Sequence, residues 1–125
     1  MQIEYRDGLL FTELTIQYKG QSKFIKDIVI DTGASHTLIS QDAVDEIDIR
    51  ATKEDHFITN YGIGGEEHAF IKRIDLIEIG GYTLKDVEID FTAFRYNING
   101  LLGLDILLKG NFNIDLLNLE LKRLQ

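Results

Sequence analysis

Apolar and polar residues alternate along much of the chain with the two-residue period of a β-strand. One face of the first such segment carries Leu10, Thr12, Leu14, Ile16 and Tyr18. This pattern predicts a half-buried strand, and Lys19-Gly20-Gln21-Ser22 after it predicts a hairpin turn. The next predicted strand, Lys23 to Ile30, ends in the apolar run Ile28-Val29-Ile30. A strand that is apolar on both faces is typical of the covered centre of a sheet.

The rest of the chain continues as short strands that glycines separate. Further strands are predicted around Phe57 to Tyr61, over Ala69 to Ile79, at Val87, Ile89 and Phe91, at Phe112, Ile114 and Leu116, and at Leu119 and Leu121. Helical patterns are short: residues 40–47, with Ser40 as the expected cap, and residues 104–108. Many strands with one or two small helices predict an all-β barrel or sandwich in a single domain, residues 1–125.

Composition and charge exclude several classes of function. The chain has 125 residues, of which 44% are apolar, and a net charge of −8 from 13 basic and 21 acidic residues. Such a charge argues against a nucleic-acid partner. No segment approaches the ~20 apolar residues of a membrane span, and we expect a cytoplasmic protein with no membrane partner. The chain has no cysteine, and its histidines, at positions 36, 56 and 68, lack metal-ligand spacing. We therefore expect no metal and no other cofactor.

The string DIVIDTGAS, residues 27–35, places a carboxylate at the end of the apolar strand. A buried carboxylate must pair, accept hydrogen bonds or take up a proton. The residues after Asp31 are small, and Gly33 permits a tight turn whose N–H groups point at the carboxylate. Asp31 taken alone is explained equally well by a turn that caps the strand end or by a catalytic role.

Two later motifs favour the catalytic explanation. With DTGAS at 31–35, the strings Tyr61-Gly62-Ile63-Gly64-Gly65 and Leu101-Leu102-Gly103 follow in the order typical of one family. Over about residues 10–121 the chain resembles the single-domain, retropepsin-like aspartic proteases, including bacterial members and the domain in DNA-damage-inducible-type proteins. The resemblance implies an acid-protease barrel with a ψ-shaped loop and a flap hairpin.

The resemblance also implies a mechanism and a set of site residues. Two carboxylates that share one proton activate a water in such enzymes, and this chain has one DTG. The active form would therefore be a symmetric homodimer that contributes Asp31 twice and cleaves a peptide or protein. The implied catalytic loop is Asp31, Thr32 and Gly33. The implied substrate-binding residues are Ala34, Tyr61, Gly62, Ile63, Gly64 and Gly65, and the supporting residues are Leu102 and Gly103.

Each of these motifs also has a simpler explanation. The glycines at 62–65 can form an ordinary hairpin loop, Tyr61 can be a strand aromatic, and Leu101-Leu102 can be core alone. A nucleotide-binding loop of the actin-like ATPases is excluded because those proteins need two large lobes, and no P-loop is present.

The sequence departs from the viral members of the family at two positions. The Asp and Arg that brace the viral dimer are Ser35 and Leu104 here. We expect the apolar face of the C-terminal segment, at Phe112, Ile114, Leu116, Leu119 and Leu121, to form much of the dimer interface instead. Two other functions stay open: an inactive dimeric peptide-binding module, and a monomeric interaction domain in which Asp31 is a turn residue.

Overall fold

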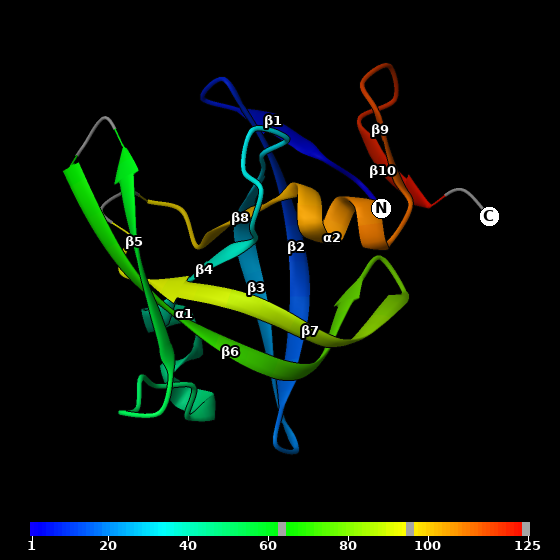
Figure 1. Ribbon diagram of the computed structural model, residues 1–125. Helices are drawn as coiled ribbons and strands as arrows, with labels where there is room; N and C mark the ends of the chain where they lie inside the picture. The colour runs from blue at the N-terminus through cyan, green and yellow to red at the C-terminus, as the bar shows by residue number, and fades with distance from the viewer. Residues whose placement is uncertain (63–64, 95–96, 124–125) are drawn as a thin grey trace.

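The computed structural model describes the chain except for residues 63–64, 95–96 and 124–125, and it omits the side chains of residues 60–67. Ten strands and three short helical segments follow one another (Figure 1). The strands are β1 (Glu4–Arg6), β2 (Leu9–Tyr18), β3 (Gln21–Ile30), β4 (Leu38–Ser40), β5 (His56–Gly62), β6 (Gly65–Ile79), β7 (Tyr82–Thr92), β8 (Gly100–Leu102), β9 (Phe112–Asp115) and β10 (Glu120–Arg123). The helical segments are α1 (Gln41–Val44), the 3-10 turn η1 (Asp45–Ile47) and α2 (Leu104–Lys109).

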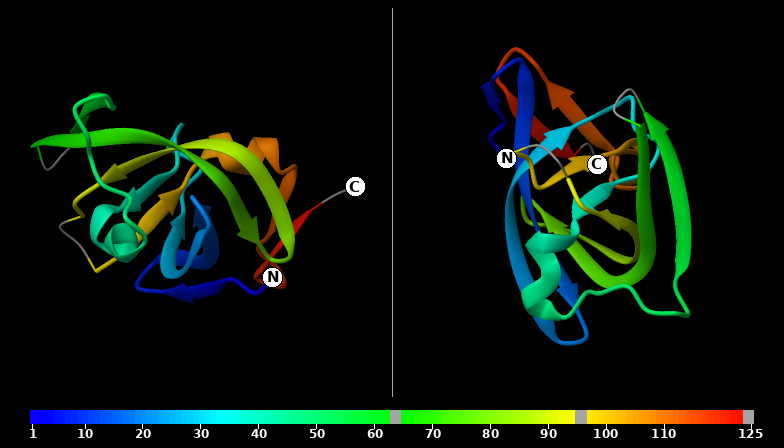
Figure 2. Two further views of the ribbon diagram at one scale, coloured as in Figure 1. Left: turned by 90° about the horizontal axis from the view of Figure 1, so that it is seen from below. Right: turned by 90° about the vertical axis from the view of Figure 1, so that its left-hand side faces the viewer.

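Eight of the strands form one mixed sheet in the order β1-β2-β3-β8-β4-β7-β6-β5. An additional pairing of β2 with β6 curls the sheet into a barrel, whose strands surround a common interior in both views of Figure 2. Strands β9 and β10 form a separate two-stranded sheet. The predicted all-β architecture with short helices is confirmed.

The apolar run at the end of β3 lies at the centre of this sheet. Ile28, Val29 and Ile30 are all buried, as their pattern predicted. Strand β8 lies between β3 and β4, parallel to β3 and antiparallel to β4, which is the predicted ψ-shaped arrangement. Gly100 permits this insertion, because a Cβ there would lie 2.6 Å from the carbonyl oxygen of Leu38. The sheet therefore delivers the residue after Ile30 to the end of its central strands.

The helical segment predicted over residues 40–47 is present over residues 41–47, as one α-helical turn, α1, followed by the 3-10 turn η1. The expected capping role of Ser40 is wrong: Ser40 ends strand β4, and its side chain makes no capping hydrogen bond. Pairing with Thr92 of β7 keeps Ser40 in extended backbone, so the helix begins one residue later than predicted. After η1, Asp48 adopts the left-handed conformation with φ 62°. Among the described residues, no helix has the length and apolar character needed to cross a membrane.

The C-terminal hairpin also differs from the prediction, in what its apolar face contacts. Leu121 is 2% exposed, and Phe112, Ile114 and Leu119 pack against the core of their own chain. The N-terminal residues hold this hairpin: the N–H of Ile3 donates to the carbonyl of Leu119 at 2.8 Å. Most of the face that we expected at a dimer interface is therefore covered within one subunit.

Candidate active site

The loop after β3 holds the Asp31 carboxylate by its own backbone. The N–H of Gly33 donates to Asp31 Oδ1 at 2.9 Å, and the N–H of Ala34 donates to the carbonyl of Asp31 at 3.2 Å. The predicted turn is present, but among the described residues only one N–H group, that of Gly33, is aimed at the carboxylate. Asp31 is partly exposed, and its Oδ2 accepts no hydrogen bond within the described part of the chain. One carboxylate oxygen is thus fixed and the other is open to a second group.

Gly33 lies close to the Asp31 carboxylate. A Cβ at this position would lie 3.2 Å from Asp31 Oδ1. A side chain here would press on the carboxylate that the Gly33 N–H binds.

Strand β8 and the glycine after it support the loop from beneath. The N–H of Asp31 donates to the carbonyl of Leu102 at 2.9 Å, and Leu102 is fully buried. A Cβ on Gly103 would lie 2.7 Å from the backbone of His36 and 2.9 Å from the carbonyl of Ala34. Because these neighbours are backbone atoms, they cannot move aside as a flexible side chain would. The sequence-predicted supporting residues therefore contact the Asp31 loop directly.

A Thr–Asp pair that sequence reasoning missed completes this support. Asp105, in the first turn of α2, accepts hydrogen bonds from the N–H and the hydroxyl of Thr37, at 3.0 and 2.7 Å. The Thr37 hydroxyl oxygen in turn accepts the N–H of Gly103 at 3.0 Å. Thr37 is fully buried, so its polar groups need these partners. In the sequence, Asp105 is visible only as an acidic residue in the first turn of a short helix.

The glycine-rich motif lies at the end of the hairpin of β5 and β6. Tyr61 pairs with Glu66, and Gly62 with Gly65, across the hairpin. Ile63 and Gly64 lie outside the described residues, as does the Tyr61 side chain. In Figure 1 this hairpin and the loop between β3 and β4 extend toward the same, upper side of the molecule.

A pocket of about 330 Å³ opens beside the loop. It is lined by Gly33, Ala34, Ser35, His36, Leu38, Asp90 and Leu101. Asp90 comes from β7 and is only 5% exposed. Burial raises the pKa of the Asp90 carboxyl above 3.8, and the nearby His36 opposes this shift. Sequence reasoning placed Ala34 at this site but not Asp90, because one acid in an otherwise alternating strand gives no signal of its own.

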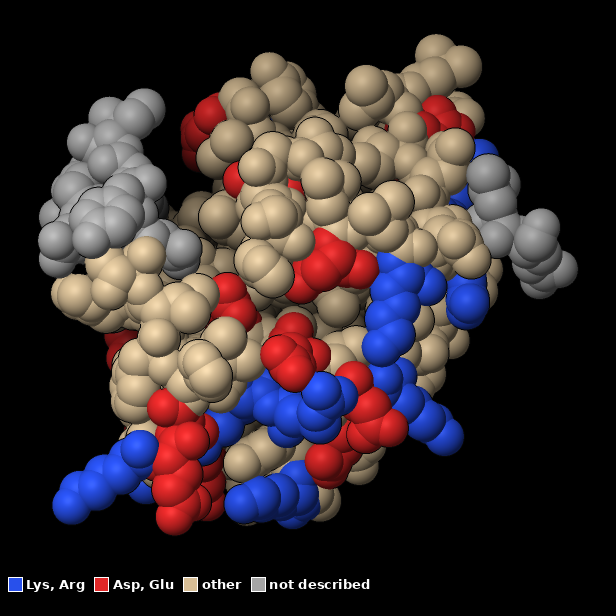
Figure 3. Space-filling model, in the orientation of Figure 1, with Lys and Arg blue, Asp and Glu red and all other residues tan. Residues whose placement is uncertain are grey.

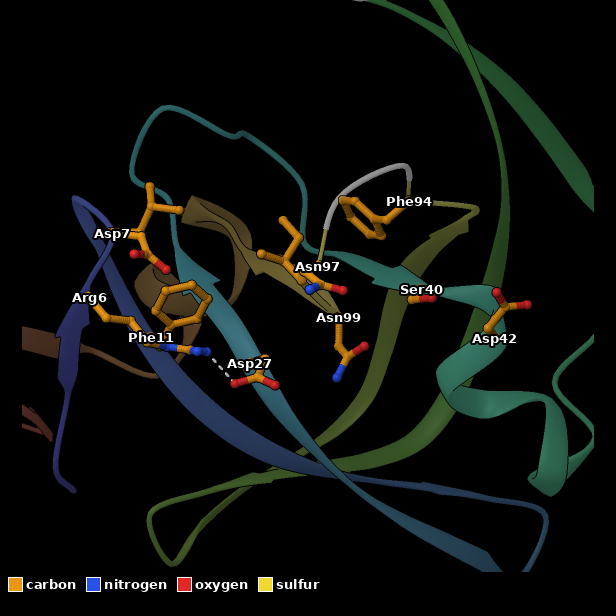
Figure 4. Close-up of a pocket in the computed structure, with 11 residues that line it drawn as sticks. Arg6, Asp7, Phe11, Asp27, Ser40, Asp42, Phe94, Asn97 and Asn99 are labelled. Carbon is orange, nitrogen blue, oxygen red and sulfur yellow. Dashed lines mark hydrogen bonds and ion pairs between the residues drawn. The ribbon is translucent and has the colours of Figure 1, made fainter.

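A larger cavity, of about 540 Å³, lies apart from Asp31 and contains none of the predicted site residues (Figure 4). Arg6 crosses its wall, forms an ion pair with Asp27 and stacks 3.8 Å from the ring centroid of Phe11. These contacts use the guanidinium face and one terminal nitrogen, while the buried Nε has no hydrogen-bond partner among the described residues. Among the described residues, no group of three or more His, Cys, Asp and Glu side chains is arranged to hold a metal ion.

Comparisons with known proteins agree with this geometry. The sequence profile of a family described as aspartyl protease matches residues 14–106. A crystal structure of a retropepsin-like aspartic protease from Rickettsia conorii superposes with a TM-score of 0.71 at 23% identity, covering 95% of this chain and 93% of that one.

Two further solved structures share the fold. The EIAV protease in complex with an inhibitor gives a TM-score of 0.61 at 20% identity, covering 85% of this chain and 92% of that one. The retroviral protease-like domain of Ddi1 from Leishmania major gives 0.65 at 15% identity, covering 92% and 87%. A search of curated proteins found no significant match. The predicted retropepsin-like fold is confirmed.

Proposed function

Because this chain belongs to the aspartyl protease family, we propose that it is an aspartic endopeptidase that acts as a homodimer. The observation that carries the proposal is the Asp31 carboxylate, with Oδ1 fixed by the Gly33 N–H at 2.9 Å and Oδ2 without a partner among the described residues. A water held between two such carboxylates is polarised for attack on a peptide carbonyl. One carboxylate takes the water's proton while the other, protonated, donates to the carbonyl oxygen.

The second carboxylate has to come from a second copy of the chain. Only one DTG occurs in the sequence, and a two-fold axis beside Asp31 brings two copies together. Thr32 is exposed in the single chain and is free to reach the partner loop. Its role in holding the two loops coplanar is part of the proposal.

The β5–β6 hairpin is the proposed flap over the substrate. An extended peptide would pair with it by main-chain hydrogen bonds, as a strand adds to a sheet edge. β5 is the last strand of the sheet order, so it offers such an edge. Tyr61, Gly62, Ile63, Gly64 and Gly65 are the proposed flap residues, and Ala34 is the proposed contact from the loop.

The proposed dimer surface lies on the side of the molecule that carries the Asp31 loop. The turn between β1 and β2 and the turn between β9 and β10 lie on this side too (Figure 1). Leu117, in the second of these turns, is 90% exposed, and Leu104 and Leu108 of α2 are also exposed. Figure 3, in the orientation of Figure 1, shows Lys and Arg mostly in the lower part of the view, while the upper part carries patches of Asp and Glu among residues of other kinds. Exposed leucine side chains such as these suit the core of an interface.

The mechanism predicts that Asp31→Asn abolishes proteolysis while the fold survives. Asparagine keeps the shape and can still accept the Gly33 N–H, but it cannot take a proton from water. We expect the rate of cleavage of a diverse peptide pool, measured by mass spectrometry, to fall at least about a hundredfold. Asp42→Asn is the matched control, since Asp42 is an exposed acid in the first turn of α1. Cleavage by Asp31→Asn at the wild-type rate would contradict the mechanism.

A dimeric peptide-binding module of the same fold is the alternative. The observation that favours it is the absence of the Asp–Arg brace, with Ser35 and Leu104 in its place. The Thr37–Asp105 hydrogen bonds, which hold the loop from within the subunit, argue against an imprecise loop. A peptide that binds the wild-type dimer and is recovered uncut would support the alternative.

A further inference from the structure

Asp90 is the one acidic residue in a row of apolar side chains. Strand pairing aligns Asp90 with Leu38 on one side and Ile71 on the other, and Leu38 with Leu101. Aligned residues on neighbouring strands point to the same face of a sheet. The pocket beside the Asp31 loop therefore has apolar walls, at Leu38 and Leu101, and a carboxylate among them.

This carboxylate has no structural partner. The Asp90 carboxylate accepts no hydrogen bond and forms no ion pair within the described part of the chain. The residue is nevertheless buried, with only 5% of its surface exposed. A buried acid that serves the fold is normally hydrogen-bonded, because an unsatisfied one costs free energy. Its backbone N–H, in contrast, is used, and donates to the carbonyl of Thr37 at 3.2 Å. The side chain is therefore available to a ligand in the pocket.

The charges around Asp90 favour a cationic ligand. Three titratable groups act on it: His36 from the loop, Asp105 from α2, and Glu88 from its own strand. Asp105 is occupied by Thr37, and Glu88 pairs with Arg73 of β6 at 2.8 Å. No Lys or Arg among the described residues forms an ion pair with Asp90.

We propose that Asp90 is a specificity-determining residue that selects substrates with a lysine or arginine side chain next to the cleaved bond. The inference rests on the proposed protease function and names its substrate class. The long aliphatic part of such a side chain packs on Leu38 and Leu101, and its charged end reaches the carboxylate. Because the pocket includes Gly33 and Ala34, a side chain seated in it belongs to a residue close to the peptide bond that the Asp31-activated water would attack.

The proposal includes a direction of pH dependence. Burial raises the pKa of Asp90 above 3.8, so the carboxylate is lost at a higher pH than an ordinary aspartate. Protonation of Asp90 removes its attraction for a cation. The preference for lysine and arginine should therefore weaken as the pH falls, relative to an apolar residue at the same position.

The test is a peptide library that varies each position around the scissile bond, cleaved by the wild-type protein and three variants. At one position the wild type should favour lysine or arginine over norleucine by about tenfold or more, equivalent to roughly 1.4 kcal/mol. Asp90→Asn should remove this preference, and Asp90→Leu should reverse it. Asp86→Asn is the matched control, because it removes the same charge from an exposed position of the same strand.

Thermal unfolding of the same variants separates a specificity role from a structural one. Since the folded-state pKa of Asp90 is raised, the ionised carboxylate lowers stability at any pH above its folded-state pKa, and this loss vanishes below about 3.8. Asp90→Leu should therefore raise Tm at pH 7 and raise it less in acid. A lower Tm at pH 7 would contradict the proposal.

The outcomes distinguish this inference from the function on which it rests. Cleavage by the wild type without a basic preference, or with a preference that survives in Asp90→Leu, contradicts the role of Asp90 and leaves the protease assignment intact. No cleavage of any library member contradicts the protease assignment, and the substrate preference fails with it.

Discussion

Thr37 and Asp105 show how single residues fix the loop that carries Asp31. The Thr37 hydroxyl donates to Asp105 and accepts from Gly103, so it links α2 to the glycine beneath the loop. Asp105 also accepts the N–H of Ile106 at 2.8 Å. The position of Asp31 thus depends on hydrogen bonds several residues away, and a change at Asp105 should affect both stability and activity.

We predict that Asp105→Asn destabilises the protein by about 1–3 kcal/mol. The asparagine amide has one acceptor oxygen, whereas the two hydrogen bonds from Thr37 go to two different carboxylate oxygens of Asp105. The buried Thr37 N–H or hydroxyl would be left without its partner. Urea unfolding would measure the loss, and Asp42→Asn, at the matching position of α1, should change stability by less than about 0.5 kcal/mol. Equal stability of Asp105→Asn and the wild type would show that the pair is not needed.

The C-terminal hairpin shows how one side chain shapes an element. Asp115 Oδ1 accepts the N–H groups of Leu117 and Asn118, each at 3.0 Å, and its Oδ2 lies 3.0 Å from Lys122 Nζ. These bonds close the turn at Leu117-Asn118 between the last two strands. Hydrogen bonds from Asn118, followed by Lys122, hold the pKa of Asp115 well below its usual range.

The lowered pKa predicts an acid-sensitive hairpin. A carboxyl whose pKa is lower in the folded state adds stability above its unfolded pKa of about 3.8, and this is lost as pH falls through the folded value. We expect Asp115→Ala to lower Tm slightly at pH 7, and the difference from wild type to narrow below pH 3.8. Asp115→Asn keeps an acceptor oxygen for the N–H groups of the turn and should lower Tm less than Asp115→Ala does. A difference that is constant with pH would contradict this assignment.

At the scale of the whole molecule, one side carries both the Asp31 loop and the β9–β10 turn, which contains exposed leucines. Leu116 and Leu117 are 65% and 90% exposed, whereas Ile114 contacts the core of its own chain. Ile114→Asp would therefore damage the subunit itself and could not test the interface that the alternating pattern predicted. Only the residues left uncovered by the fold can report on dimerisation.

We predict that Leu117→Asp weakens the homodimer at least about tenfold without unfolding the subunit. A charge in a desolvated interface loses its hydration without a partner. Sedimentation at micromolar concentration would measure the dissociation constant, and circular dichroism would check the fold. Phe24→Asp is the control, since Phe24 is 50% exposed and lies on β3, outside the Asp31 loop and the β9–β10 turn. An unchanged dissociation constant would exclude this turn from the interface.

By itself the sequence determined the strands, their turns and the loop that carries Asp31. These depend on local properties: the two-residue period of β2, the apolar run before Asp31, and a glycine beside the carboxylate, at Gly33. The resemblance to the retropepsin-like aspartic proteases, carried by three ordered motifs, predicted the acid-protease barrel. The fold is as expected.

Only the tertiary structure decided which residues surround Asp31. Thr37 meets Asp105 across 68 residues, and Asp90 meets the loop through the pairing of β4 with β7. Such contacts depend on strand order and register, which the alternating pattern of a single strand does not encode. For the same reason, the pattern could not tell that the C-terminal hairpin covers its own core, since an apolar face looks alike whether its partner is the same chain or another.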